Sequence, residues 1–157
     1  MLNDRVLPRG ELPNDLGIAR VDELIALGRL EDAASEWRLL VRRYSSEAQL
    51  GLAQYALDNN RPFMAIDAAN TARAWDAIDL RFPSAFLEVF LVAAANTRLD
   101  AEQLMAIARR ESAMYPAAVS RVGASGLMQV MPATARSVAR RAGIPWRADA
   151  LYDADYN

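Results

Sequence analysis

The chain has 157 residues, of which 53% are hydrophobic and 24% charged, and its formal net charge is -2. A chain of this length can bury an apolar core in one or two small domains, and this composition excludes a disordered chain. The small net charge gives no electrostatic reason to expect nucleic acid as a partner. All 18 basic residues are arginines, scattered along the sequence, which indicates genomic base composition rather than function.

The sequence contains no cysteine and no histidine. The lack of cysteine excludes disulfides, thiol nucleophiles and thiolate metal sites. The lack of histidine excludes Ser-His-Asp arrangements and H-E-x-x-H zinc sites. Because Asp, Glu and Tyr are the general acids and bases that remain, any catalytic activity must be carboxylate chemistry. We expect no metal and no other cofactor.

The sequence has no run of about 18 apolar residues, so we expect no transmembrane segment. Residues 1–5 lack the apolar region of a signal peptide. From these features alone, the chain is either cytoplasmic or a piece of a longer protein.

Hydrophobic periodicity predicts helices in series after a connecting segment, residues 1–17. Helices at 18–27 and 30–41, separated by Gly28, predict an αα-hairpin. The other predicted helices are, in chain order, 46–57 with Ser45 or Ser46 as N-cap, one from Pro62 to Trp75, one from Pro83 to Phe90, and 101–113 capped by Asp100.

No stretch alternates with the period of a strand, so the predicted fold class is all-α. Serial short helices predict a helical-hairpin, superhelical segment in which neighbouring helices form the core. The composition changes near Asp100, which predicts a helical segment at 1–98 and a second domain at 99–157. Aromatic side chains at helical spacing usually face the core, and we expect this of four residues, Trp37, Trp75, Phe82 and Phe86.

The candidate site lies in residues 111–131, where an acid, glycines and a polar group within an apolar segment occur together. Cleaving a glycosidic bond needs a protonated acid beside the leaving oxygen and stabilisation of an oxocarbenium-like centre. Burial of Glu111 against apolar walls, at the negative end of a helix dipole, would favour its protonated form. Glu111 is therefore the candidate general acid.

Polar and glycine residues after Glu111 suit a sugar-binding site. Gly123 and Gly126 permit tight turns and let a sugar approach the backbone. Gln129 offers both a donor and an acceptor to an acetamido group or a hydroxyl. Ser120 could hydrogen-bond the carboxyl group or the substrate.

Apolar and aromatic residues of the same stretch could complete the site. Met128 and Met131 could form an adaptable floor under sugar rings. Tyr115 could pack under the loop or line the groove. The alternative is that Glu111 is an ordinary solvated residue at a helix end and that 120–126 is a surface loop.

This stretch resembles the signature of the soluble lytic transglycosylases, whose catalytic domain is lysozyme-like (goose-type). The matching positions are Glu111-Ser112-x-x-x-Pro116 and Ser120-x-x-Gly123-Ala124-x-Gly126-Leu127-Met128-Gln129-Val130-Met131-Pro132-x-Thr134-Ala135. The sequence around 75–83 and 106–109 is similar to the end of the family's superhelical domain. The final residues, Leu151-Tyr152-Asp153-x-x-Tyr156-Asn157, are similar to the segment after the second helix of its catalytic domain.

The resemblance implies cleavage of the β-1,4 bond between N-acetylmuramic acid and N-acetylglucosamine in peptidoglycan. The muramyl 6-hydroxyl attacks its own anomeric carbon and leaves a 1,6-anhydro end, with one glutamate acting as acid and then as base. Glu111 matches that glutamate. Residues that match groups lining the family's site are Ser120, Gln129 and Met131, and those on the structural part of its motif are Pro116, Gly123, Gly126 and Leu127.

The resemblance also implies a periplasmic protein whose partner is peptidoglycan. The family's catalytic domain continues past the equivalent of Asn157, through an Ala-Tyr-Asn-Ala-Gly type motif that closes the groove. We therefore expect this chain to be an internal fragment with an incomplete groove. Two other functions stay open: a non-catalytic helical scaffold, and a goose-type muramidase in which water replaces the 6-hydroxyl.

The last five residues, 153–157, resemble the start of an EF-hand loop. Such a loop also needs a glycine and a bidentate glutamate, which do not follow in this sequence. Three oxygen ligands cannot complete the six to eight that Ca²⁺ takes, so no metal site is predicted here.

Overall fold

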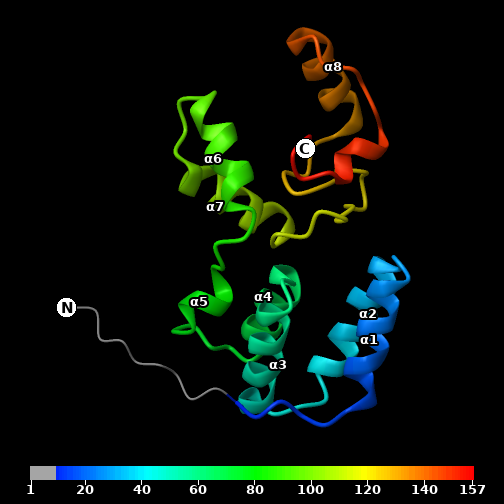
Figure 1. The fold of residues 1–157 in the computed structure, drawn as a ribbon, viewed down its shortest axis with the longest axis vertical. Coiled ribbons are helices and arrows are strands. Elements are labelled where there is room, and N and C mark those ends of the chain that lie inside the picture. The colour runs from blue at the N-terminus through cyan, green and yellow to red at the C-terminus, as the bar shows by residue number, and fades with distance from the viewer. Residues whose placement is uncertain (1–9) are drawn as a thin grey trace, which may run out of the picture. The chain divides into compact units, whose positions relative to one another are not determined.

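The structure, a computed structural model, describes residues 10–157 (Figure 1). Within that range extended structure is confined to isolated bridges that pair Ser125 with Val119 and Val130, so the all-α prediction is confirmed. No helix formed by these residues combines the length and apolar character that crossing a membrane requires. The elements are α1 (Leu16–Ala26), α2 (Leu30–Val41), α3 (Ser46–Asp58), α4 (Pro62–Thr71), α5 (Ile78–Arg81), α6 (Leu87–Ala95), α7 (Ala101–Ser112), α8 (Pro132–Ala142) and the 3-10 helix η1 (Asp149–Tyr152).

The chain folds into two compact units, unit 1 (Met1–Pro83) and unit 2 (Ser84–Asn157). Helix α6, which the sequence prediction grouped with the first segment, packs against α7 in unit 2. The two units therefore divide before the composition change near Asp100, whose role as a domain boundary stays a prediction. The part of the predicted connecting segment at residues 1–9 lies outside the described residues.

Unit 1 begins with the predicted αα-hairpin. The Asp15 carboxylate accepts a hydrogen bond from the Gly17 backbone N–H at 2.6 Å and so caps α1. Gly28 has a φ of +71° between α1 and α2, a conformation that side chains with a Cβ rarely adopt. The two helices pack side by side, and α3 packs against α4 in the same way (Figure 1).

The core of unit 1 is built around Trp37, which is fully buried as predicted. Its indole Nε1 donates to the Met64 carbonyl at 3.0 Å, so the one polar atom of the ring is satisfied inside the core. Small residues pack around it, with Ala33 on α2, Ala53 on α3 and Ala65 on α4 all fully buried. Side chains this small let the helix backbones approach closely.

The prediction that Trp75 and Phe82 fill the core is wrong. Trp75 is 60% exposed and Phe82 is 53% exposed. Helix α4 ends at Thr71 instead of continuing to Trp75, because Arg73 adopts a left-handed conformation with a φ of 55°. The Arg81 guanidinium lies 4.9 Å from the Trp75 ring and 5.1 Å from that of Phe82, so the cation covers both exposed rings.

The helix predicted to open at Pro83 begins later. Pro83 is buried but lies outside any helix, and the short helix α5 before it was not predicted. Helix α6 starts at Leu87, after Phe86 turns the chain with a φ of 57°. The predicted core residue Phe86 is only half-buried. Proline suits a first helical turn, but here tertiary packing outweighs that preference.

Helix α7 has the start that the sequence predicts. The Asp100 carboxylate accepts from the Gln103 backbone, while the Asp100 backbone N–H donates to the Gln103 side chain at 3.0 Å. This reciprocal arrangement is a capping box, which satisfies two donors at the helix end. The buried residues Leu104 and Ala108 lie on one face of the helix, whose last turn carries Glu111.

Candidate functional site

Glu111 lies in the last turn of α7, and its side chain is exposed. The apolar enclosure expected from the sequence is therefore absent among residues 10–157. The next residue, Ser112, is buried, and its hydroxyl donates to the Ala108 carbonyl at 3.1 Å. The helix thus presents the carboxylate of Glu111 to solvent while its neighbour fixes the helix end.

The chain leaves α7 through two consecutive left-handed residues, Ala113 with a φ of 55° and Met114 with a φ of 63°. Met114 is 2% exposed, and its burial helps to hold this uncommon conformation. The Tyr115 backbone N–H donates to both the carbonyl and the hydroxyl of Ser112, at 3.2 Å and 3.3 Å. The sequence offered no glycine or asparagine here from which this sharp turn could be predicted.

Ser120 stabilises the turn that follows. Its hydroxyl accepts from the Ala124 N–H at 2.9 Å, while its own N–H donates to the Ala124 carbonyl at 2.8 Å. Gly123 completes the turn with a φ of +87°, as the predicted tight turn requires. The Ser120 hydroxyl can still donate its proton, so a bond to substrate stays a prediction.

Gln129 has a φ of 49°, and its side chain stabilises the loop by hydrogen bonds to the loop's own backbone. Its Nε2 donates to the Ala118 carbonyl at 3.1 Å and to the Gly126 carbonyl at 3.0 Å. The prediction gave this side chain both a donor and an acceptor for a sugar, but its donors are engaged within the loop. What Gln129 can still offer a ligand is its acceptor Oε1, and its role in binding stays a prediction.

Asn157 holds the same loop from the end of the chain, and sequence reasoning missed it. Its Oδ1 accepts from the Met128 N–H at 2.7 Å, and its Nδ2 donates to the carbonyls of Ser125 at 3.0 Å and Leu151 at 2.9 Å. The available signal was its place at the end of the segment that resembles the family. All three of its bonds reach backbone atoms, which hydrophobic periodicity cannot reveal.

Gly126 lies in the part of the loop to which Gln129 and Asn157 bond, and it has a φ of +81°. A Cβ on this residue would stand 2.1 Å from the Leu151 carbonyl oxygen and 2.3 Å from the Asn157 amide nitrogen. The residue must therefore be glycine for two reasons, its backbone conformation and the close approach of another segment. The sequence predicted only the first.

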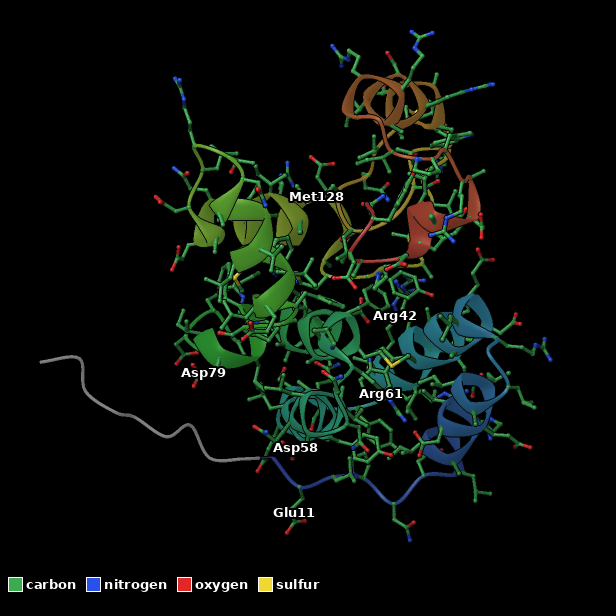
Figure 2. All side chains as sticks on the ribbon, turned by 45° about the horizontal axis from the view of Figure 1, so that its top comes forward. Glu11, Arg42, Asp58, Arg61, Asp79 and Met128 are labelled. Carbon is green, nitrogen blue, oxygen red and sulfur yellow. The ribbon has the colours of Figure 1, made fainter. Side chains whose placement is uncertain are left out.

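The apolar residues of the motif divide into buried and accessible ones. Leu127 is 1% exposed and belongs to the core of unit 2, as expected of a structural position. Met128, labelled in Figure 2 on the loop after α7, is half-buried, and Met131 is 41% exposed. Tyr115 and Pro116 are half-buried. The two methionines are thus accessible to a ligand, and their contact with the faces of sugar rings stays a prediction.

Backbone hydrogen bonds connect the end of α7, which carries Glu111, to the loop that Gln129 and Asn157 stabilise. Ser112 accepts from Tyr115, the Tyr115 carbonyl accepts from the Ala118 N–H at 3.1 Å, and the Ala118 carbonyl accepts from the Gly126 N–H at 2.9 Å. Since Gln129 also donates to that Ala118 carbonyl, the predicted site residues share one network. The carboxylate of Glu111 itself is not part of it.

The EF-hand-like residues 153–157 form a turn. The Asp153 carboxylate accepts from the Asp155 N–H at 3.1 Å, an Asx-type turn. Within residues 10–157, no group of three or more acidic, cysteine or histidine side chains has the geometry to hold a metal ion.

Comparison with known proteins places both units in one family. Residues 11–78 match the family model described as the soluble lytic murein transglycosylase L domain, and residues 88–157 match that described as the transglycosylase SLT domain. The soluble lytic murein transglycosylase of Escherichia coli K12 is 39% identical over 128 residues, which are 82% of this chain and 20% of that protein.

Two solved structures agree with this assignment. The 70 kDa soluble lytic transglycosylase of Escherichia coli superposes with a TM-score of 0.84 and 34% identity, over 94% of this chain and 25% of that one. An inactive glutamate-to-glutamine mutant of the lytic transglycosylase Slt of Pseudomonas aeruginosa gives a TM-score of 0.85 and 34% identity, over 92% of this chain and 24% of that one. The chain spans about a fifth to a quarter of the length of these relatives, and it belongs to the soluble lytic transglycosylase family.

Proposed function

We propose that the protein to which this chain belongs cleaves the β-1,4 bond between N-acetylmuramic acid and N-acetylglucosamine in peptidoglycan, in the periplasm, with Glu111 as its acid and base. The names of the relatives support the substrate and the reaction type. The 157 residues supply the acid and one braced loop of the site, and no cofactor takes part in the proposed reaction.

The reaction has two proton transfers and needs no added water. In the first step, Glu111 in its protonated form donates to the glycosidic oxygen, and the bond from that oxygen to the muramyl anomeric carbon breaks. In the second step, the Glu111 carboxylate takes the proton of the muramyl 6-hydroxyl, whose oxygen forms a bond to the anomeric carbon. The products are an N-acetylglucosamine end and a 1,6-anhydro end. An internal nucleophile removes the need for the second carboxylate of ordinary glycosidases.

The observation that carries the proposal is the position of Glu111, an accessible carboxylate on the last turn of α7, a helix whose end is connected by backbone hydrogen bonds to the loop that Gln129 and Asn157 hold. A carboxylate that must meet a polymer has to be accessible before the polymer binds. A bound sugar then excludes water, and desolvation favours the protonated form of a carboxyl group. The inactive glutamate-to-glutamine mutant of the Pseudomonas aeruginosa relative also supports a glutamate as the acid.

The proposal gives the loop the task of positioning the substrate. The Oε1 of Gln129 and the hydroxyl of Ser120 are the groups that can meet an acetamido N–H or a sugar hydroxyl. Met128, Met131 and Tyr115 offer accessible apolar surface for the faces of sugar rings. Because the loop is held by internal hydrogen bonds, these groups need little reorganisation when the glycan binds.

The test uses purified peptidoglycan and mass analysis of the released muropeptides. The 157-residue chain is compared with a chain completed to the length of its relatives, each as the wild type and as Glu111→Gln. Glu102→Gln is the matched control, since Glu102 is an exposed glutamate on the same helix. We expect products lighter by one water than normal reducing ends from the completed wild type and from Glu102→Gln, and none from Glu111→Gln.

Each other outcome would change one part of the proposal. Normal reducing ends would make the protein a goose-type muramidase. No product from the completed wild type would favour a non-catalytic helical scaffold. Unchanged cleavage by Glu111→Gln would overturn the assignment of the acid.

A further inference from the structure

Asn157 is half-buried, and the hydrogen bonds of its side chain all go to backbone atoms. Its Nδ2 donates to the carbonyls of Ser125 at 3.0 Å and Leu151 at 2.9 Å. Its Oδ1 accepts from the Met128 N–H at 2.7 Å. A primary amide has two N–H donors, so both donors of Asn157 are engaged within the protein. The side chain therefore acts on the backbone that it holds and not by donating to a ligand.

The backbone that this side chain holds is a tight turn, residues 125–130. Ser125 and Val130 pair at its base through two backbone bonds, at 3.1 Å and 3.0 Å, and the Gln129 N–H donates to the Gly126 carbonyl at 3.2 Å. Gly126 and Gln129 both adopt left-handed conformations, with φ values of +81° and 49°. For a residue with a Cβ such a conformation costs free energy, so surrounding contacts have to maintain it at Gln129.

Asn157 restricts this turn at two places. Its bonds fix the peptide unit between Ser125 and Gly126 and the peptide unit directly before Met128. The dihedral angles between these two planar units therefore have little freedom. The restriction matters most at Gly126, because a glycine without such contacts populates many conformations. The third bond, to the Leu151 carbonyl, connects the turn to η1.

The turn carries groups that the proposed function assigns to glycan binding. Met128 is half-buried within the turn, and Gln129 follows it with its acceptor Oε1. Met131, which is 41% exposed, comes directly after the turn. A change in the dihedral angles of the turn would move these groups, because all of them are attached to it. Asn157 thus controls the shape of a surface to which it contributes no donor.

We propose that Asn157 is a positioning residue for the cleavage reaction, which keeps the turn 125–130 in the conformation that binds the glycan. This inference rests on the proposed function. Without the Asn157 side chain the turn would exchange among several conformations, and the glycan would bind the competent one. The apparent affinity then falls in proportion to the population of that conformation, whereas the bound complex reacts as before. The loss should therefore appear in KM and not in kcat.

The test uses the chain completed to the length of its relatives and soluble, uncrosslinked peptidoglycan strands at increasing concentration. The rate is the formation of products lighter by one water than normal reducing ends, measured by mass analysis. We expect Asn157→Ala to raise KM about tenfold and to change kcat less than about twofold, as a competent population of about one in ten implies. Hydrogen exchange in peptides that contain Met128 should become faster, since its N–H loses the acceptor.

Two control variants of unit 2 separate positioning from stability. Ala139→Gly places a glycine at a buried position of α8, so it weakens the helix and leaves the turn unaltered. Tyr156→Phe removes a neighbouring side-chain bond, from the Tyr156 hydroxyl to the Pro145 carbonyl. Both controls should have the KM of the wild type. A merely structural role would lower the amount of folded enzyme, which reduces the apparent kcat and leaves KM unchanged.

Asn157→Asp is a second variant, which keeps the shape of the side chain if the alanine variant does not fold. It retains the acceptor for the Met128 N–H, but an oxygen replaces the nitrogen that donates to Ser125 and Leu151. At neutral pH two carbonyl oxygens would then face a carboxylate oxygen without a donor between them. KM should therefore rise in this variant as well.

The outcomes separate this inference from the proposed function. A wild-type KM in both Asn157 variants, whatever their kcat, would overturn the inference and leave the proposed function standing. An equal rise of KM in Ala139→Gly would also overturn it, because general destabilisation would then explain the effect. No cleavage by the wild type would instead overturn the proposed function, and this inference with it.

Discussion

The two units are stabilised in different ways. Within residues 10–157 the seven largest fully buried side chains are Trp37, Leu40, Leu52, Ile66, Leu127, Val21 and Val41, and all but Leu127 lie in unit 1. Unit 1 is therefore held mainly by apolar side chains between helices. In unit 2 the segment around the candidate site is held by amide side chains, Gln129 and Asn157, that bond to backbone atoms.

This difference suits the proposed tasks of the two units. A helical segment that serves as support needs only close packing between its faces. A loop that must present groups to a ligand cannot bury them, so its shape has to come from hydrogen bonds to its own backbone. Unit 1 has a similar side-chain to backbone contact where α2 meets α3: the Gln49 side chain donates to the carbonyls of Val41 and Tyr44. In unit 2 such hydrogen bonds, from Gln129 and Asn157, stabilise the loop of the candidate site.

The largest expected effect is that of Trp37→Ala in unit 1. The change removes a fully buried indole together with its hydrogen bond to the Met64 carbonyl, which should cost about 3–5 kcal/mol of unfolding free energy. Urea unfolding followed by circular dichroism measures the loss, and hydrogen exchange locates it. We expect lost protection in α2, α3 and α4. Equal loss at the amides of Gly126 and Val130 would break the comparison, because the two units would then unfold together.

Gly126→Ala should cost less unfolding free energy than Trp37→Ala, and its effect should be confined to unit 2. The new Cβ would meet the Leu151 carbonyl oxygen in a left-handed backbone conformation, at a cost of about 2–4 kcal/mol. Gly123→Ala is the matched control, since it has a similar φ but nothing within 4 Å of its Cβ, and it should cost about 1 kcal/mol. Hydrogen exchange of the Gly126 and Val130 amides measures both. Equal costs would show that backbone strain alone, without close packing, governs this loop.

The smallest expected effect concerns pH and the cap of α1. The hydrogen bond from the Tyr44 hydroxyl to Asp15, at 2.6 Å, and that from the Gly17 N–H hold the pKa of the Asp15 carboxyl below its ordinary value. A lowered folded pKa means that this stability is fully present above about pH 4 and is lost as the pH falls through the folded value. Tyr44→Phe should therefore lower the Tm more in neutral than in acidic buffer.

The control for this prediction is Tyr152→Phe, which alters an exposed tyrosine of η1 in unit 2. Its effect on the Tm should be small and the same in both buffers. If the Tyr44→Phe difference did not change with pH, the Asp15 contact would contribute nothing to the stability of unit 1 through its charge.

Much of the helical framework could be predicted because its signals are local. The start of α7 was predicted because Asp100, a capping residue, directly precedes an apolar helical pattern, and the α1–α2 hairpin because Gly28 interrupts one. Trp75 was predicted wrongly because the helix pattern continued past the point at which the chain turns, at Arg73. The residue that ends α4 has no helix-breaking side chain, so nothing local marked it.

The candidate site also contains residues that could be predicted from local sequence and residues that could not. The Glu111 motif could be recognised in the sequence, since its residues and their spacing are a pattern along one chain. Asn157 could not be assigned its task, because it acts on Met128 and Ser125 across about 30 positions.

The sequence by itself determined the all-α class, the helix starts at Ser46, at Pro62 and after Asp100, and the motif that carries Glu111, because each depends on neighbours within a few positions. Tertiary structure alone decided that Glu111 is exposed, that the donors of Gln129 serve the loop, and that Gly126 has no room for a Cβ. These features depend on which distant backbone atoms come together, and that is settled only when the chain has packed.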